Sequence, residues 1–459
     1  MQLHEHQRKI AQSKARFKVI RGGRRGGKTA LEIETLCFKA VSGANRNVFY
    51  VAPTQVQARS IIWEGLKARL ANIGEPYEQR LEMRVPTTNG SHSLIKVAGW
   101  ENRENFRGQS AHHITFDETD TMKDFFIGWQ EIFRPALIDT AGTSDFIGTP
   151  KKENPNLRRL EKEADHEWEL FHFTSWDNPS LAREELEKAK KEMDADTYRQ
   201  EIMAEYVDNS GSLFKYTSLL DLFTNTITKS PEKYLTIDVA EDGSDKTVFT
   251  CWQGLEAYRV DLYSFPTEEA LIAQIREVAA QERIPYSQIT IDAIGVGSGA
   301  ARSAQLAGIV PFKSSFSAIK TDLDVVRLPN VHYLDHAPLT TEYRNLRSQC
   351  VFELARLVNE HKIAVKVDDV RVKSQIIEEL ATYQDASRGD GKRFATEKED
   401  IKALLGRSPD ISDTLVMRMY FVIRERMLPY PSEHAANIHT QLDNHFATRS
   451  ARQHLNKTR

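Results

Sequence analysis

The sequence predicts an α/β protein in two parts, first a parallel sheet with flanking helices and then a mixed sheet. Three observations support this prediction. A glycine-rich loop near the N-terminus stands between a strand-like run and a helix-like run. Strand-like and helix-like segments then alternate, which is typical of a parallel sheet covered by helices. After about residue 230, three strand-like runs follow one another closely, as they do in an antiparallel meander.

Composition limits the class of protein. The 459 residues are 40% hydrophobic and 28% charged, which is ordinary for a globular chain of two to three domains. The net charge of −3 excludes a basic surface over the whole molecule, so any nucleic-acid surface must be local. Cys37, Cys251 and Cys350 lie far apart without metal-ligand spacing and fit reduced thiols. No apolar run approaches the ~18 residues of a membrane span, and no signal-peptide core opens the chain, so we expect no membrane partner.

The glycine-rich loop fits the phosphate-binding pattern G-x-x-x-x-G-K-[ST]. Its glycines let backbone N–H groups point at phosphate oxygens, Lys28 adds a point charge, and the Thr29 hydroxyl is a ligand for Mg²⁺. Residues 17–20 read as the strand entering the loop and residues 30–40 as the helix leaving it. This context predicts a P-loop NTPase domain. Its candidate ATP-binding residues are Arg21, Gly22, Gly23, Arg24, Arg25, Gly26, Gly27, Lys28 and Thr29. Which of the three arginines faces phosphate stays open.

An apolar strand that ends in two carboxylates, Asp117 and Glu118, follows about ninety residues later. In a nucleoside triphosphatase one such carboxylate holds Mg²⁺ and the next polarises the attacking water. We assign Asp117 to the metal, together with Thr29, and Glu118 to the water. Without the phosphate loop upstream, the same pattern would describe a strand that ends in a solvated acidic turn.

Two further residues are candidates for this site. Thr149 ends a short apolar strand at residues 146–149, where a hydroxyl can sense the γ-phosphate. The alternative is that the residue simply ends a strand before a turn and has no role in the site. Arg107 lies about ten residues before the acidic pair. It can reach phosphate in a neighbouring subunit or form an ordinary salt bridge, and both interpretations stay open.

In the second half, three separated aspartates carry the chemistry. Asp238 lies in an apolar strand at residues 234–240, Asp292 ends a later strand, and Asp413 lies in the first turns of a helix over about 410–424. A carboxylate inside an apolar strand is costly to bury without a partner. Carboxylates on two strands and a late helix predict an RNase H-like nuclease core. Such a core holds two Mg²⁺ or Mn²⁺ ions about 3.5–4 Å apart for phosphodiester hydrolysis.

Other acidic and basic residues of this half are more ambiguous. Asp410 complements the helix dipole as readily as it binds metal, and Asp242 and Asp245 belong to a turn. A hairpin with a partly basic tip is expected between residues 383 and 400, where it contacts DNA phosphates or is simply solvated. Its DNA-binding candidates are Arg388, Lys392, Arg393, Lys398 and Lys402.

These features divide the chain into four expected segments. Residues 1–210 form the ATPase domain, which includes a small helical lid over about 151–210. Residues 211–230 form a linker that starts at a polar turn cluster. Residues 231–428 form the nuclease domain, and residues 429–459 form a flexible tail.

Taken in order, the motifs resemble the large terminase subunit of tailed bacteriophages over roughly residues 1–425. The matching pieces are residues 22–29, 117–118, 148–150, 177–179, 238, 292–297 and 408–413. The family pattern often ends Asp-Ala-Leu. Here it reads Asp413-Thr414-Leu415, which keeps the acid in place.

The resemblance implies an ATPase that drives double-stranded DNA into a procapsid, joined to a nuclease that cuts concatemeric DNA. It implies that Gln7 contacts adenine and that Arg107 acts in trans. The implied partners are the portal protein and the terminase small subunit, with a pentameric ring on the portal and monomers in dilute solution. The implied location is the host cytoplasm, transiently on the procapsid portal and not in the mature virion.

Two other functions are compatible with parts of the sequence. A DNA helicase or repair translocase with a fused nuclease needs a second motor core, whereas the chain has one phosphate loop. A nucleotide-binding assembly protein with an inactive nuclease predicts no DNA cleavage even with Mn²⁺.

Overall fold

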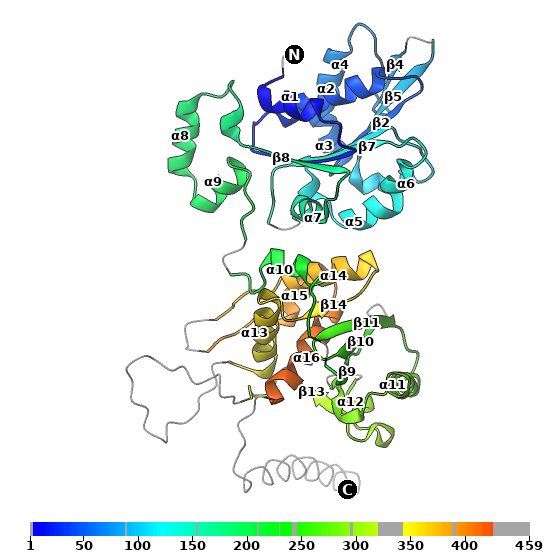
Figure 1. The fold of residues 1–459 in the computed structure, drawn as a ribbon, viewed down its shortest axis with the longest axis vertical. Helices are drawn as coiled ribbons and strands as arrows, with labels where there is room; N and C mark the ends of the chain where they lie inside the picture. The colour runs from blue at the N-terminus through cyan, green and yellow to red at the C-terminus, as the bar shows by residue number, and fades with distance from the viewer. Residues whose placement is uncertain are drawn as a thin grey trace, which may run out of the picture. The chain divides into compact units, whose positions relative to one another are not determined.

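The protein was studied as a computed structural model. It describes residues 3–87, 90–152, 155–208, 211–228, 230–240, 246–293, 297–319, 343–387 and 392–425. The chain divides into two compact units (Figure 1): unit 1 is Met1–Ser210 with Asp368–Gln375, and unit 2 is Gly211–Val367 with Ile376–Arg459. No helix in these described ranges is long and apolar enough to cross a membrane.

Unit 1 is built on an eight-stranded sheet of order β3-β4-β5-β2-β6-β7-β1-β8. Six neighbouring strands of this order, β5-β2-β6-β7-β1-β8, pair in parallel, which confirms the predicted parallel sheet. Strands β3 and β4 add an antiparallel edge that the sequence analysis did not predict. The strands are β1 (Phe17–Gly22), β2 (Asn47–Ala52), β3 (Glu75–Tyr77), β4 (Glu82–Pro86), β5 (His92–Gly99), β6 (His113–Asp117), β7 (Thr143–Gly148) and β8 (Trp168–Phe173).

Helices cover the sheet of unit 1. The longer ones are α1 (Glu5–Gln12), α2 (Lys28–Val41), α7 (Asn156–Glu163), α8 (Arg183–Glu192) and α9 (Ala195–Glu201). The shorter ones are α3 (Gln55–Ala58), α4 (Glu64–Arg69), α5 (Phe125–Gly128) and α6 (Arg134–Ala136). A π-helical turn, Arg59–Trp63, joins α3 to α4. Figure 1 shows α8 and α9 set apart from the sheet.

Strand β8 corrects one expectation. Residues 168–173 fall in the segment interpreted as a helical lid, but they pair in parallel with β1 along its whole length. The physical reason is the placement of apolar side chains: Phe173 packs into the cluster that also contains Ile20 and Leu31, and Trp168 packs against Phe17. The helical parts of this segment are α7, before β8, and α8 and α9, after it.

An aromatic cluster fixes the strand that carries the predicted acidic pair. Phe116 of β6 stacks on Phe146 of β7 with ring centroids 5.3 Å apart, and Phe133 meets it edge-on. Each such pair contributes on the order of 1 kcal/mol beyond the burial of apolar area. This packing holds the ends of β6 and β7 in register, so Asp117 lies opposite Ile147.

Unit 2 is built on a six-stranded sheet of order β13-β12-β9-β10-β11-β14. Strands β9, β10 and β11 form the predicted antiparallel meander, and β12 joins β9 in parallel, so the mixed sheet is confirmed. The strands are β9 (Lys233–Asp238), β10 (Thr247–Gln253), β11 (Glu256–Tyr263), β12 (Ile289–Asp292), β13 (Val310–Phe312) and β14 (Ala364–Val365). Its helices are α10 (Tyr216–Asp221), α11 (Glu268–Glu282), α12 (Gly297–Ala300), α13 (Leu346–Asn359), α15 (Lys398–Leu405) and α16 (Asp410–Glu425). Helix α14 (Val370–Ala381) belongs to unit 1 up to Gln375 and to unit 2 from Ile376.

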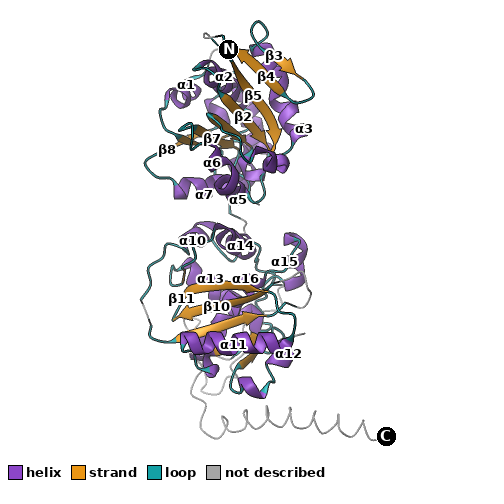
Figure 2. Cartoon of the chain, turned by 90° about the vertical axis from the view of Figure 1, so that its right-hand side faces the viewer, coloured by secondary structure: helices purple, strands orange, loops and turns teal. Residues whose placement is uncertain are grey.

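The two faces of this sheet differ in chemistry because side chains alternate along a strand. Leu235 and Ile237 of β9 pack with α11 in an apolar cluster. The alternate residue Thr236 lies on the other face, and from neighbouring β10 the Thr250 hydroxyl lies 2.7 Å from the Thr414 hydroxyl of α16. Figures 1 and 2 show the strands between α11 and the pair α13 and α16. Asp238, two residues after Thr236, is therefore directed toward α16.

Candidate nucleotide and metal sites

The strand order of unit 1 gathers the predicted nucleotide residues at one edge of the sheet. Strands β6, β7 and β1 are neighbours and parallel, so their carboxyl ends meet. Asp117 ends β6, Thr149 directly follows β7, and the glycine-rich loop follows β1. In open parallel sheets this edge is where ligands bind.

Lys28 and Thr149 are in direct contact. The Lys28 ammonium donates to Thr149 Oγ1 at 2.7 Å and to the carbonyl oxygens of Gly22 and Gly23 at 3.1 and 3.3 Å. Thr149 in turn donates to the Gly22 carbonyl at 2.9 Å. The lysine predicted to bind phosphate and the threonine predicted to sense it are thus brought together.

Helix α1 packs against the phosphate loop. Gln7 is buried, and its amide Nε2 donates to the Gly27 carbonyl at 2.8 Å. Gly27 has a φ of +98°, in the left-handed region that favours glycine. A Cβ there would lie 2.6 Å from Gln7 Nε2, so the close approach of Gln7 requires glycine at this position.

The loop arginines separate into different roles. Arg21 turns away from the loop: its Nε lies 3.1 Å from Glu161, and its guanidinium stacks 4.6 Å from the Tyr206 ring centroid. Arg24 pairs with Glu201 at 3.0 Å while its side chain stays 69% exposed. Arg25, with φ of +60°, is exposed. Arg21 is therefore placed as a packing residue, in contrast to the expectation that listed it for ATP.

The backbone of the loop is tied to the segment before α8. Ser175 Oγ donates to the Arg24 carbonyl at 2.6 Å, and Asn178 Nδ2 donates to the Arg25 carbonyl at 2.7 Å. The sequence analysis matched residues 177–179 as a motif without a role for them. These hydrogen bonds show that Ser175 and Asn178 anchor the backbone of the phosphate loop.

Asp117 and Glu118 differ in environment. Asp117 is buried, with Tyr50 donating to Oδ2 at 2.6 Å and the Glu118 N–H donating to Oδ1 at 2.9 Å. Burial, reinforced by the Glu118 carboxylate, raises the pKa of Asp117 to about 6. Glu118 has a φ of +50°, a strained conformation for a side chain of this size that costs on the order of 1 kcal/mol. Such strain is concentrated at functional sites.

Glu32 was missed by the sequence analysis. It lies on α2, is 2% exposed, and has no hydrogen-bond partner for either carboxyl oxygen among the described residues. Burial, followed by the proximity of Asp117, raises the pKa of Glu32 well above its ordinary range. Its spacing of three and four residues from Thr29 and Lys28 was the available signal, since helix positions so spaced share a face.

Arg107 is half-exposed and forms ion pairs within its own chain. Its Nε lies 2.5 Å from Glu104 and its Nη2 lies 3.3 Å from Glu131. In the single chain Arg107 therefore forms ordinary salt bridges. Its contact with phosphate in a neighbouring subunit stays a prediction.

In unit 2, the three predicted aspartates line one cavity of about 460 Å³. Asp238 and Asp292 end the neighbouring parallel strands β9 and β12, where Ile237 pairs with Ile291 one residue earlier. Asp413 enters from the first turn of α16. Asp410, Lys398 and Lys402 line the same cavity.

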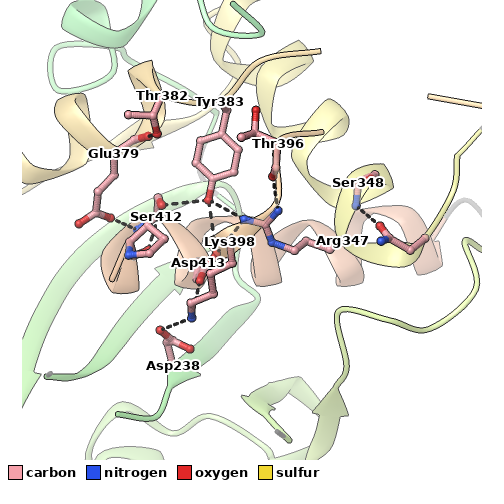
Figure 3. Close-up of polar contacts among 12 residues, drawn as sticks. Asp238, Arg347, Ser348, Glu379, Thr382, Tyr383, Thr396, Lys398, Ser412 and Asp413 are labelled. Carbon is pink, nitrogen blue, oxygen red and sulfur yellow. Dashed lines mark hydrogen bonds and ion pairs between the residues drawn. The ribbon is translucent and has the colours of Figure 1, made fainter. Parts of the chain in front are cut away.

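A lysine joins two of these carboxylates (Figure 3). The Lys398 ammonium lies 2.7 Å from Asp413 Oδ2 and 3.5 Å from Asp238 Oδ2. Burial raises the pKa of Asp238 well above its ordinary range, although Lys398 acts in the opposite direction. Burial also acts on Asp413, but Lys398 and Arg347 hold its pKa below the ordinary range. The ammonium is therefore a cation held between buried carboxylates, as a metal ion would be.

Residues that the sequence analysis did not single out support Asp413 from the other side. Arg347 Nη2 lies 3.6 Å from Asp413 Oδ1, and the Tyr383 hydroxyl donates to the same oxygen at 3.3 Å. Arg347 also donates to the Thr396 carbonyl at 2.7 Å, which ties α13 to the hairpin. No sequence signal marks Arg347, since its partners are 49 and 66 residues away in the chain.

The carboxylates fit a divalent cation by chemistry, because hard oxygen ligands in a buried, negatively charged cavity suit Mg²⁺ or Mn²⁺. Within the described ranges, however, no group of three or more His, Cys, Asp or Glu is drawn closely enough together to hold an ion. Asp238 and Asp413 meet through Lys398, while Asp292 lines the cavity beside them.

The hairpin expected between residues 383 and 400 is present at its base, where Asp385 bridges Ala395 in antiparallel fashion. Arg393 packs its guanidinium 4.0 Å from the Phe352 ring centroid, and Lys398 is engaged by carboxylates. Both side chains have these protein partners, and their role as phosphate contacts stays a prediction. Lys392 is exposed, whereas Arg388 lies outside the described residues, as do Asp242, Asp245 and residues 426–459.

Comparison with known proteins finds a family match in the first half of the chain. Residues 19–221 match the family model described as terminase large subunit, T4likevirus-type, N-terminal. Over these residues the chain is similar to the N-terminal part of terminase large subunits. The resemblance to terminases drawn from the motifs is confirmed.

Two curated terminase large subunits are similar over part of their length. The protein of Escherichia phage T5 is 27% identical over 214 residues, covering 45% of this chain and 47% of that protein. The terminase of Thermus virus P23-45 is 26% identical over 254 residues, covering 48% and 52%. The chain thus spans about half the length of the terminases it matches.

Solved terminase structures are also similar. The ATPase domain of the Thermus phage P74-26 terminase is 24% identical, with 45% of this chain and 94% of that chain covered and a TM-score of 0.40. The large terminase of a thermophilic bacteriophage is 14% identical, with 88% and 97% covered and a TM-score of 0.41. The nuclease domain of bacterial virus Sf6 gp2 is 19% identical, with 45% and 98% covered and a TM-score of 0.37.

Proposed function

We propose that this protein is the motor and nuclease of a phage packaging machine. ATP hydrolysis in unit 1 drives double-stranded DNA into a procapsid, and unit 2 cuts concatemeric DNA. One observation carries the proposal: a single chain holds the Lys28–Thr149 contact beside buried Asp117, and the separate Asp238–Lys398–Asp413 cluster. The first is suited to nucleotide hydrolysis and the second to a metal-dependent cut.

In the ATPase site each side chain has a defined task. Thr29 and Asp117 would hold Mg²⁺, which supplies charge stabilisation at the phosphates. When nucleotide binds, Lys28 donates to phosphate oxygens instead of to Thr149. Thr149 thereby loses its contact with Lys28 whenever nucleotide is bound. Glu118, at the strained strand end, orients the attacking water. Gln7, which contacts the loop at the Gly27 carbonyl, is the residue proposed to contact adenine, as the resemblance implies.

In the nuclease site, Asp238, Asp292 and Asp413 would hold Mg²⁺ or Mn²⁺, which lowers the pKa of water and stabilises the leaving oxygen. Lys398 neutralises two of these carboxylates, so an incoming cation competes with its ammonium. Once displaced, Lys398 is free to pair with a DNA phosphate, which is the role first expected for it. Tyr383 and Arg347 keep Asp413 oriented during this exchange.

The family likeness extends the proposal to partners. The motor works on double-stranded DNA, docks on a portal protein as a homo-oligomeric ring of about five copies, and receives DNA from a terminase small subunit. It acts in the host cytoplasm and is monomeric in dilute solution. Arg107 is the residue expected to reach the nucleotide of a neighbouring copy when the ring forms, after leaving Glu104 and Glu131.

The proposal is tested with the purified full chain in two assays. Phosphate release from ATP with Mg²⁺ measures the first site, and conversion of supercoiled plasmid to nicked and linear forms with Mg²⁺ or Mn²⁺ measures the second. EDTA should abolish both. Turnover of ATP without any plasmid cutting in Mn²⁺ would instead support an assembly protein with an inactive nuclease. ATP-dependent strand separation of a forked duplex would support a helicase.

A further inference from the structure

Glu32 occupies an unusual position on the helix that follows the phosphate loop. It lies three residues after Thr29 and four after Lys28 on α2, so it shares their face of the helix. Helix α2 packs on β2 and β6, the strands that carry Tyr50 and Asp117. Glu32 is therefore enclosed between the phosphate-binding residues and the acidic strand end.

Its carboxyl group lacks any donor. The side chain is 2% exposed, and neither oxygen accepts a hydrogen bond from the described residues. The neighbouring donors are already used: the Tyr50 hydroxyl donates to Asp117, and the Lys28 ammonium donates to Thr149 and two carbonyls. Burying a carboxyl group without a hydrogen-bond donor destabilises the folded protein. A donor that binds beside it would offset this cost.

Glu34, two residues along the same helix, shows the ordinary alternative. It lies near the surface and accepts hydrogen bonds from the Arg69 guanidinium at 2.8 and 3.0 Å. The Glu34 carboxylate therefore has its hydrogen-bond donors within the protein. The same helix leaves Glu32 unsatisfied beside Asp117 and Lys28.

The missing donor matches what a bound magnesium ion brings. Protein-bound Mg²⁺ keeps several of its waters, and each of these waters is a hydrogen-bond donor. The oxygens of Asp117 already have one donor each, from Tyr50 and from the Glu118 N–H. We infer that Glu32 is a further positioning residue of the ATPase magnesium site, accepting a hydrogen bond from a water ligand of the ion beside Asp117. This inference rests on the proposed ATPase function.

The test uses the full chain with Glu32→Gln, which removes the charge and keeps the shape. Binding of a fluorescent ADP analogue is titrated with Mg²⁺ and, separately, in EDTA. We expect affinity in EDTA within twofold of wild type and a Mg²⁺ requirement raised about tenfold or more, the typical cost of losing a partner of a metal ligand. The melting temperature without Mg²⁺ should stay level or rise, because an unsatisfied buried carboxyl is removed.

Two further variants keep the test decisive. Glu34→Gln, on the same helix, should bind nucleotide with the Mg²⁺ dependence of wild type. Glu32→Asp retains a carboxylate and should lie between wild type and Glu32→Gln. A Glu32→Gln protein with wild-type Mg²⁺ dependence would overturn the inference, and so would one that melts lower and binds less in EDTA, since that is a packing defect. If wild type itself shows no Mg²⁺-dependent nucleotide binding, the proposed function fails instead.

Discussion

The Lys398 ammonium lies 2.7 Å from Asp413, and the same nitrogen reaches Asp238 at 3.5 Å. A protein cation thus neutralises the carboxylates that are expected to bind metal. Removing one partner of a buried charge pair leaves the other uncompensated. We expect Lys398→Ala to destabilise the metal-free protein by about 1–3 kcal/mol, because Asp238 and Asp413 both lose this cationic donor, and Asp413 keeps only Tyr383 and Arg347 on its other oxygen.

Mn²⁺ should stabilise the Lys398→Ala variant more than it stabilises wild type. Melting temperature measured in EDTA and in Mn²⁺ should show a larger Mn²⁺-induced increase for Lys398→Ala than for wild type. Lys246→Ala is the control, because its ammonium donates to Ser264 on the surface of the same unit. Equal Mn²⁺ responses of the two variants would show that Lys398 does not compete with metal.

The Lys28–Thr149 contact predicts a kinetic effect. Thr149→Val keeps the shape but removes the hydroxyl that accepts from Lys28 and donates to Gly22. If Thr149 senses the γ-phosphate, kcat for ATP should fall about tenfold, or about 1.4 kcal/mol, with little change in KM. Thr149→Ser retains the hydroxyl and should recover most of the turnover. A change in KM alone would assign Thr149 to binding rather than to sensing.

The tie between Asn178 and the loop predicts a binding effect. Asn178→Ala removes the 2.7 Å hydrogen bond to the Arg25 carbonyl. A lost hydrogen bond of this kind is worth about 0.5–1.5 kcal/mol, so we expect the Kd for ADP to rise by roughly threefold to tenfold. Asn225→Ala removes the same kind of bond, to the Ile363 carbonyl at 2.9 Å in unit 2, and should leave the Kd unchanged. Equal effects of the two variants on ADP binding would contradict a role for the loop carbonyls.

Asp117 predicts a pH dependence of stability. Burial, with help from Glu118, raises its pKa from 3.8 to about 6. The folded state then binds the proton more tightly than the unfolded state, so this group lowers the free energy of unfolding as pH rises from about 4 to 6. The shift corresponds to about 3 kcal/mol above pH 6.

This pH dependence is measured with Asp117→Asn, which cannot ionise. The melting temperature of the metal-free variant, relative to wild type, should rise between about pH 4 and pH 6 and then level off. Asp139→Asn, an exposed change in the same unit, should give no such trend. Parallel curves for wild type and Asp117→Asn would mean that Asp117 is ionised normally in the folded protein.

The sequence was sufficient where chemistry is encoded in local spacing. The glycines of the phosphate loop determine its backbone conformation, which places Lys28. An acidic pair directly after an apolar strand lies at the carboxyl end of that strand, which places Asp117 and Glu118. Asp238 was recognisable because it lies within an apolar strand, and Asp413 because it lies in the first turns of a predicted helix. The parallel and mixed sheets followed from the same alternation of strand-like and helix-like segments.

What the sequence did not reveal depends on contacts between distant segments. Lys398 was interpreted as a DNA contact because a lysine near a hairpin tip resembles one, and only tertiary packing places it between two aspartates. Arg21 was grouped with the phosphate loop by proximity in sequence, but Glu161 and Tyr206 draw its side chain away. Glu32 reads as an ordinary helix residue until its burial is known.

The central claim is that one chain holds two separate sites, one that hydrolyses ATP and one that cuts DNA. The most direct test measures ATP turnover and Mn²⁺-dependent plasmid cutting on the same preparations of Glu118→Gln and Asp238→Asn. We predict that Glu118→Gln loses ATP turnover and still cuts plasmid, while Asp238→Asn loses cutting and still hydrolyses ATP. Plasmid cutting by Asp238→Asn at the wild-type rate, or normal ATP turnover by Glu118→Gln, would contradict it.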